Sequence, residues 1–239
     1  MMPEPTYQPR MRRSRASWPR LIVTAIVAVL LAPYLIAPFY NFIRPVSMPM
    51  LWRYLTFQRV ERIYMPIERL GRAVPLAVVI AEDGRFCSHY GVDFQEIQNA
   101  IADAEDVDDL RGGSTVTQQV AKNLFLWGGR SFVRKVLEFP LAIWIDLVMP
   151  KRRILEIYLN IAEWGPDGEF GVEAGSRRAF GRPAAAAGPA EAALLAAMLP
   201  NPVKRDAKRP GPGLRRLAGL YVSRASSAPS ADQCIRRTP

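Results

Sequence analysis

The sequence is poor in the residue types that build many metal sites. It contains one histidine, His89, and two cysteines, Cys87 and Cys234. A structural zinc site needs a cluster of such ligands, so this class of site is excluded. Two cysteines are also too few for a disulfide framework. Pairing them would require the end of the chain to fold back onto the region of Cys87. No pattern in the sequence suggests this, so we do not expect a disulfide.

Charged residues are absent between Arg20 and Arg44. As a helix, residues 21–43 would be about 34 Å long, which exceeds a bilayer core of about 30 Å, so we predict one transmembrane helix there. The length of the run and the lack of a small-residue cleavage site argue against a removed signal peptide. A buried core helix is the alternative. Pro33 and Pro38 should kink the helix or end its regular part early.

Basic residues outnumber acidic ones and give a formal net charge of +10. They gather after Pro202 and before the apolar run, where five arginines stand: Arg10, Arg12, Arg13, Arg15 and Arg20. A nucleic-acid groove needs basic residues spread along a surface, so nucleic acid is not an expected partner. By the positive-inside rule, residues 1–20 form a cytoplasmic basic tail and the rest of the chain lies outside.

The chain after the apolar run divides by composition. Residues 44–74 mix aromatic and basic side chains, as expected of a juxtamembrane connector. Residues 75–210 are long enough for one sizeable core, and we predict one catalytic domain there. Residues 211–239 are rich in Pro, Gly, Ser and Arg, which predicts a poorly ordered basic tail. The acidic run 103–109 predicts a solvated loop without a catalytic role.

Helix signals begin at Pro75, where an apolar segment leads to Glu82 and favours a buried helix of about two turns, with a strand as the alternative. An acid at the end of an apolar run is a candidate general base, because desolvation raises a carboxyl pKa. Acidic pairs such as Glu82-Asp83 more often lie on solvated surfaces, so this stretch alone does not decide. Asp93 and Glu96 fit a capping box for a helix over 94–104, which gives Asp93 a structural interpretation.

Ser114 follows two glycines and is a good N-cap for a helix that ends near Leu126. With Lys122 two turns on, this helix start is a plausible diphosphate cradle. The alternative is a capped helix with a solvated polar face. Ser131 should cap the next helix, in which Pro140 predicts a kink close to Glu138.

Pro150 should start a further helix, and for two of its polar residues, Glu156 and Asn160, we favour a structural role. The residues of this helix that should face the core are Ile154, Leu155, Tyr158 and Ile161.

Four motifs in a fixed order carry a family resemblance. They are Glu82-Asp83-x-x-Phe86-x-x-His89-x-Gly91-x-Asp93, Gly112-Gly113-Ser114-Thr115-Val116-Thr117-Gln118-Gln119, Arg134-Lys135-x-x-Glu138 and Ile154-Leu155-Glu156-x-Tyr158-Leu159-Asn160. From about Pro75 to Pro210 the chain resembles the peptidoglycan glycosyltransferases of family 51. Residues 160–166 and 199–202 are similar to segments of the monofunctional branch. Residues 171–181 resemble the fifth motif of the family, with Ala179 where an aromatic residue is more usual.

The resemblance implies a mainly α fold, with a lysozyme-like helical catalytic domain, a smaller membrane-proximal lobe and one preceding transmembrane helix. It implies polymerisation of glycan chains from lipid-linked disaccharide-peptide (lipid II). In this reaction the acceptor GlcNAc 4-hydroxyl attacks the MurNAc anomeric carbon of the growing chain, and undecaprenyl diphosphate leaves. The expected partners are lipid II, the lipid-linked glycan, the membrane and other cell-wall synthesis proteins. The expected location is the bacterial inner membrane, with the catalytic domain in the periplasm.

The resemblance also implies roles for individual residues. Glu82 matches the general base of the family and Glu138 its second catalytic glutamate. The implied substrate-binding residues are Asp83, Ser114, Gln119, Lys122, Arg130 and Arg134. A divalent cation, Mg²⁺ or Mn²⁺, is compatible with the substrate diphosphate, but the sequence offers no carboxylate cage of its own for a metal.

Two other functions are open to a helical membrane-anchored chain. A lytic, lysozyme-like enzyme would also use a glutamate, but it has no need of cations such as Lys122 and Arg130 for a lipid diphosphate. A non-catalytic membrane scaffold of cell-wall synthesis would keep the helices and lose those charges. The presence of Lys122 and Arg130 disfavours the lytic hypothesis. The presence of all four charged residues, Glu82, Lys122, Arg130 and Glu138, disfavours the scaffold hypothesis.

Overall fold

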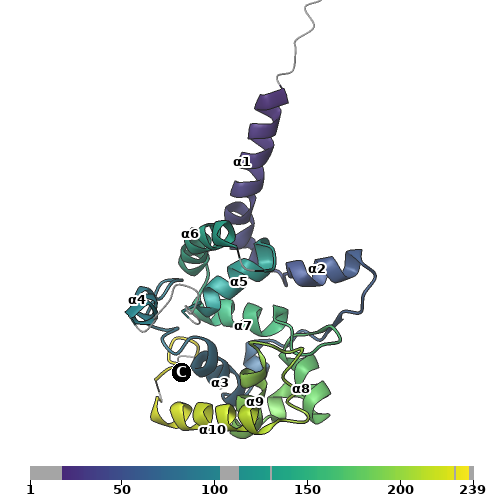
Figure 1. Ribbon diagram of the computed structural model, residues 1–239, viewed down its shortest axis with the longest axis vertical. Helices are drawn as coiled ribbons and strands as arrows, with labels where there is room; N and C mark the ends of the chain where they lie inside the picture. Colours follow the sequence, from purple (N-terminus) through teal and green to yellow (C-terminus); the bar gives the residue numbers. More distant parts are fainter. Residues whose placement is uncertain (1–17, 103–112, 130, 229, 237–239) are drawn as a thin grey trace, which may run out of the picture.

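The computed structural model describes residues 18–102, 113–129, 131–228 and 230–236, and it is helical almost throughout (Figure 1). Its helices are α1 (Trp18–Ile36), α2 (Met48–Leu55), α3 (Ala73–Glu82), α4 (Phe94–Ala102), α5 (Val116–Phe125), α6 (Phe132–Val148), α7 (Lys151–Ile161), α8 (Val172–Phe180), α9 (Pro189–Met198) and α10 (Pro212–Ser227). Shorter elements are the 3-10 helices η1 (Ala37–Asn41), η2 (Ile67–Arg69) and η4 (Ala184–Ala186) and the parallel strands β1 (Glu61–Arg62) and β2 (Glu169–Phe170). The predicted mainly α fold is confirmed.

Helix α1 projects from the domain, and none of its residues is buried (Figure 1). Its apolar side chains are open to the surroundings; Val29, for example, is 71% exposed. Together with η1 it is long and apolar enough to cross a membrane. Pro33 lies inside α1, and regular α geometry ends at Ile36, before Pro38. The predicted early end is therefore confirmed, and the α-helix occupies a shorter part of 21–43 than expected.

The core is built from two sets of helices with α7 between them (Figure 1). On the side of α1, α5 packs against α6 and α7, and on the far side α3 packs against α9 and α10. The stripe of Val116, Val120 and Leu124 on α5 is buried, because these residues recur at helical spacing and face α6 and α7. All four residues predicted to form the core face of α7 are also buried.

The polar residues of α7 order the connector that follows α1. The Glu156 carboxylate accepts hydrogen bonds from the Tyr64 hydroxyl and from the Ile67 backbone N–H at 3.0 Å. The Asn160 side chain pairs with the Met65 backbone, accepting at 2.7 Å and donating at 2.9 Å. The structural role that the sequence favours for Glu156 and Asn160 is confirmed.

Two expectations about the end of the chain were wrong. Most of the segment predicted to be a disordered tail forms α10, whose Ala218 and Tyr221 are buried against the domain. Apolar residues recur at helical spacing in α10 and explain why it forms. The Gly, Ser and Arg residues between them made the composition resemble that of a disordered segment. The chain then turns back, and Cys234 forms a disulfide with Cys87, which we had not expected. An ion pair from Arg72 to Asp232 at 2.8 Å holds the same segment.

The predicted N-cap of α4 is confirmed, whereas the N-cap of α5 is a different residue from the predicted one. Asp93 accepts the Glu96 backbone N–H at 3.0 Å, as predicted. For α5 the N-cap is Thr115 rather than Ser114, because Thr115 and Gln118 form a reciprocal capping box.

Candidate active site

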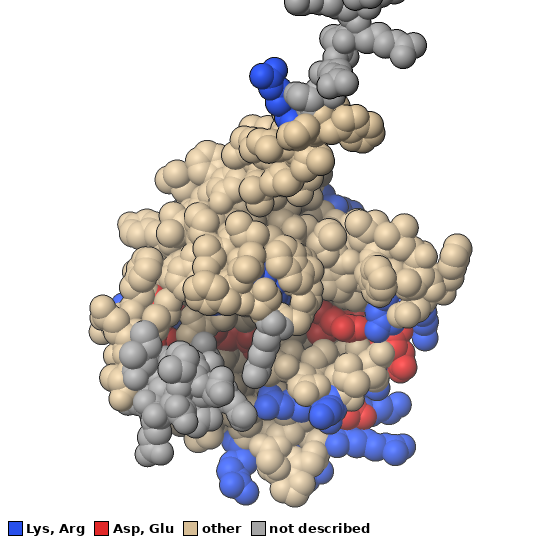
Figure 2. All heavy atoms as spheres, turned by 45° about the horizontal axis from the view of Figure 1, so that its top comes forward, with Lys and Arg blue, Asp and Glu red and all other residues tan. Residues whose placement is uncertain are grey.

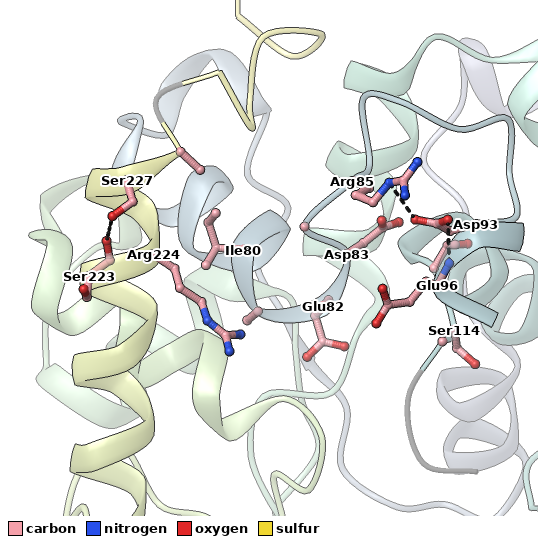
Figure 3. A pocket seen from close by; sticks show the side chains of 15 residues that line it. Ile80, Glu82, Asp83, Arg85, Asp93, Glu96, Ser114, Ser223, Arg224 and Ser227 are labelled. Atoms are coloured by element: carbon pink, nitrogen blue, oxygen red, sulfur yellow. Dashed lines mark hydrogen bonds and ion pairs between the residues drawn. The ribbon is translucent and has the colours of Figure 1, made fainter. Parts of the chain in front are cut away.

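A cavity of 620 Å³ opens where α3, α4, α5 and α10 approach one another (Figure 3). It is lined by Ile80, Ala81, Glu82, Asp83, Gly84, Arg85, Asp93, Glu96, Gly113, Ser114, Thr115, Ser223, Arg224, Ser227 and Ala228. Three predicted site residues, Glu82, Asp83 and Ser114, are therefore brought together in its wall. The contribution of α10 was not foreseen, because that segment was expected to be disordered.

Glu82 is the last residue of α3, whose preceding turns are buried, and its carboxyl group lies partly within the core. Its Oε2 accepts a hydrogen bond from Gln119 Nε2 at 2.8 Å, whereas its buried Oε1 has no partner among the described residues. Burial raises the pKa of Glu82, and this outweighs the opposite effects of Gln119 and of the charge on Lys122. The predicted desolvation of Glu82 is confirmed, and one carboxylate oxygen is left to accept a proton.

Gln119 is held by Tyr158, which the sequence placed in the fourth motif and on the core face of α7 without a role at the site. The Tyr158 hydroxyl donates to Gln119 Oε1 at 3.2 Å, which orients the Gln119 amide toward Glu82. Burial raises the pKa of Tyr158 well above its ordinary value, so this hydroxyl stays protonated and remains a donor. The fourth motif includes this tyrosine, but the sequence gives no sign of its contact with Gln119.

Asp83 lines the cavity, but its carboxylate is used within the protein. It contacts His89 Nε2 at 2.9 Å and accepts the Val116 backbone N–H, at the first turn of α5, at 3.0 Å. The loop between them also needs Gly91, at φ +80°, because a Cβ there would lie 2.4 Å from the Ala142 carbonyl oxygen. The first motif thus fixes the start of α5 beside Glu82.

Glu138 is 2% exposed and is surrounded by cations on its own helix. Arg134 forms an ion pair with it, and Lys135 Nζ lies 2.7 Å from its Oε1. Lys135 also donates to the Ser114 hydroxyl at 2.9 Å, which joins the second motif to the third. Ser131 caps α6 as predicted, and α6 continues through Pro140 without interruption.

Lys122 lies on α5 within electrostatic reach of both glutamates. Burial lowers the pKa of Lys122, the charge on Glu138 opposes this most strongly, and the nearby cations Arg134 and Lys135 reinforce it. The side chain of Lys122 has no hydrogen bond or ion pair within the described residues, so it is available to an anion. Arg130, the other cation implied for the diphosphate, lies outside the described residues.

Metal binding by the protein alone does not fit this site. Although Glu82, Asp83, Asp93 and Glu96 all line the cavity, no group of three or more His, Cys, Asp or Glu side chains in the described part of the chain is arranged to hold an ion.

Comparisons with known proteins agree with the motifs. The family model described as Transglycosylase matches residues 51–219. Three similar proteins carry the name biosynthetic peptidoglycan transglycosylase. The one from Nitrobacter hamburgensis is 59% identical, covering 86% of this chain and 91% of its own. The one from Rhodopseudomonas palustris strain TIE-1 is 56% identical, covering 91% and 92%. The one from Agrobacterium fabrum is 48% identical, covering 90% and 95%.

Proposed function

The chain belongs to the transglycosylase family and is a glycosyltransferase that polymerises peptidoglycan glycan chains, and we propose that Glu82 and Glu138 perform two different tasks in this reaction. Glu82 is the general base, and Glu138 organises the cations on the diphosphate side. The proposed substrates are lipid II as acceptor and the lipid-linked growing glycan as donor.

The environment of Glu82 supports its role as base. Its Oε1 has no partner among the described residues, and its raised pKa makes it a better proton acceptor than an exposed carboxylate. In the proposed step Glu82 takes the proton of the acceptor 4-hydroxyl while the hydroxyl oxygen bonds to the donor anomeric carbon. The bond from that carbon to the diphosphate oxygen breaks, and the bonding pair leaves with the lipid diphosphate. Attack from the opposite face inverts the α-linkage to a β-1,4 bond.

Cations support the assignment of the diphosphate side. Arg134 and Lys135 both act electrostatically on Lys122, and Glu138 offsets part of the charge of this cluster. Such a cluster favours a diphosphate, whose negative charge grows as the bond breaks. Ser114, Gln119 and Arg130 complete the proposed substrate-binding set, with Asp83 as a scaffold for the start of α5. Any divalent cation would be held mainly by the diphosphate oxygens, because the described side chains offer no cluster for it.

The observation that carries this proposal is the buried Oε1 of Glu82, which lies in the wall of a cavity and has no hydrogen-bond partner among the described residues. The test is to incubate the purified protein with lipid II and to separate the products by length. The expected result is long glycan from the unaltered protein and glycan formation that is slower by about 10²–10⁴ in Glu82→Gln. Cleavage of preformed glycan without polymerisation would instead identify a lytic enzyme.

We propose that the chain is a single-pass protein of the inner membrane with its catalytic domain in the periplasm. Further support comes from the surface next to α1, where Figure 2 shows few charged side chains. Helices η1 and α6 pack against α1, and Phe132 and Leu147 of α6, together with Phe42 directly after η1, are at least 75% exposed. A reporter that is active only after export, fused after Pro239, should be active. A reporter active only in the cytoplasm should not be, and the reverse pattern would refute this orientation.

A further inference from the structure

Arg224 stands in the wall of the cavity opposite Glu82. It lies on α10, lines the cavity and is exposed. Figure 3 shows its guanidinium group directed from α10 into the space beside the Glu82 carboxyl group. Its side chain makes no hydrogen bond or ion pair with any residue that the structure describes, although an arginine carries five N–H donors.

The other charged groups of this cavity are either acidic or already paired. Arg85 lies 3.3 Å from the Asp93 carboxylate, so its charge is offset. Asp83 is bound to His89, and Glu82 and Glu96 add further negative charge. Arg224 is thus the one cation among the described lining residues without a partner.

The position of Arg224 is set by the packing of its helix. Tyr221, three residues earlier on α10, is buried, and α10 packs against α3 and α9. Beyond α10, the disulfide between Cys234 and Cys87 connects the chain to the motif that contains Glu82. The cation is therefore carried on a backbone that is fixed relative to the general base, which lowers the cost of ordering it on binding.

We propose that Arg224 binds an anionic group of the acceptor and thereby positions the acceptor hydroxyl for Glu82. This inference rests on the proposed function, because Glu82 as base makes its surroundings the acceptor side of the cleft. The acceptor carries two kinds of oxyanion, the diphosphate and the carboxylates of its stem peptide. Both have the planar or paired oxygens that a guanidinium group binds with two hydrogen bonds. Arg224 is a positioning residue and takes no part in proton transfer.

An initial-rate coupling assay separates acceptor binding from the chemical step. The donor is a labelled, lipid-linked glycan whose terminal 4-hydroxyl is capped, so that only added lipid II can act as acceptor. Extension of the label is measured while the lipid II concentration is varied. Arg224→Ala should raise the acceptor KM about tenfold or more, as expected for a lost charge-assisted contact, with kcat within about twofold. Arg224→Lys should recover part of the loss.

Arg216→Ala is the matched control, because Arg216 is an exposed arginine on the same helix that does not line the cavity. It should leave the acceptor KM unchanged. Both replacements are at exposed helix positions and introduce a good helix former, so both variants should fold. An acceptor KM that is equal in Arg224→Ala and Arg216→Ala would overturn the inference while leaving the proposed function intact. A lack of polymerisation by the unaltered protein would overturn both.

Lipid II with its stem-peptide carboxylates converted to amides distinguishes the two anions. If Arg224 binds a carboxylate, amidation should raise the KM of the unaltered protein to that of Arg224→Ala and leave the variant unchanged. If Arg224 binds the diphosphate, amidation should leave the ratio of the two KM values unchanged. Either result supports the inference and identifies the group that is bound.

Discussion

The surroundings of Glu82 and Glu138 differ although both glutamates lie on helices and keep a carboxyl oxygen away from solvent. Glu82 accepts a hydrogen bond from the neutral amide of Gln119, lies beside the neutral hydroxyl of Tyr158, and keeps its Oε1 without a partner among the described residues. Glu138 has both oxygens bound by cations, Arg134 and Lys135. Burial raises the pKa of Glu82, whereas Glu138 is held in ion pairs by two cations of its own helix. Burial alone therefore does not assign a role to a carboxyl group, and its partners must be known.

The two glutamates also differ in which parts of the chain surround them. The wall near Glu82 is built by the first motif, by residues 113–115 of the second motif and by α10, which the disulfide links to the first motif. Glu138 is held by Arg134 and Lys135 of the third motif, and Lys135 connects it to Ser114. The second motif thus serves both glutamates, whereas α10 and the disulfide belong to the Glu82 side, so changes in α10 should affect that side first.

The largest effect is expected from Glu82→Gln. An amide cannot accept the hydroxyl proton, and general base catalysis is worth about 10²–10⁴ in rate, so kcat should fall by that amount with substrate binding largely intact. Single-turnover rates and lipid II binding, measured together, check this. Near-normal polymerisation by the variant would remove Glu82 from the role of base.

Glu138→Gln should lower the rate less and should also change donor binding. Removing the carboxylate leaves the charges of Arg134 and Lys135 uncompensated, and breaking such a buried pair typically costs about 3–5 kcal/mol of stability. We expect an altered donor affinity together with a lower midpoint of thermal unfolding. An inert variant with unchanged donor binding and stability would mean that the two glutamates exchange roles.

Lys122→Ala should reduce polymerisation by an order of magnitude or more, since a charge-assisted hydrogen bond to the substrate is worth roughly 1.5–3 kcal/mol. Lys208→Ala is a suitable control, because Lys208 is an exposed lysine that does not line the cavity beside Glu82. Equal turnover by the two folded variants would contradict the placement of Lys122 on the diphosphate side.

Cys234→Ser should have the smallest effect on the reaction and should act on the Glu82 side alone. Loss of a disulfide typically costs about 2–5 kcal/mol of stability, and α10 should become less firmly held beside Glu82. We expect a lower unfolding midpoint and a modest rise in acceptor KM, with donor affinity unchanged. A loss of donor affinity equal to that of the acceptor would show that the two sides are not independent.

Much of the fold could be predicted because its signals are local. The buried stripe of α5 and the core face of α7 recur at helical spacing, and Asp93 and Ser131 precede helices as capping residues. The choice of Thr115 over Ser114 as N-cap was missed because both residue types cap helices and Ser114 is instead bound by Lys135.

The missing parts of the site depend on contacts between distant segments. The pairing of Cys87 with Cys234 joins positions 147 residues apart, and the burial of α10 depends on helices that precede it. Composition alone suggested disorder there, so Arg224 could not be recognised as a cavity residue. Likewise, the contact from Tyr158 to Gln119 is set by how α7 packs on α5.

The pH dependence of polymerisation tests the central claim most directly, namely that the partly desolvated Glu82 is the base. The base must be ionised to act, so kcat/KM should rise with pH through the pKa of Glu82, which burial holds above its ordinary value of 4.5. The account predicts that this acid limb is retained in the residual activity of Glu138→Gln and is lost from that of Glu82→Gln. An acid limb that persists in Glu82→Gln and disappears in Glu138→Gln would contradict it.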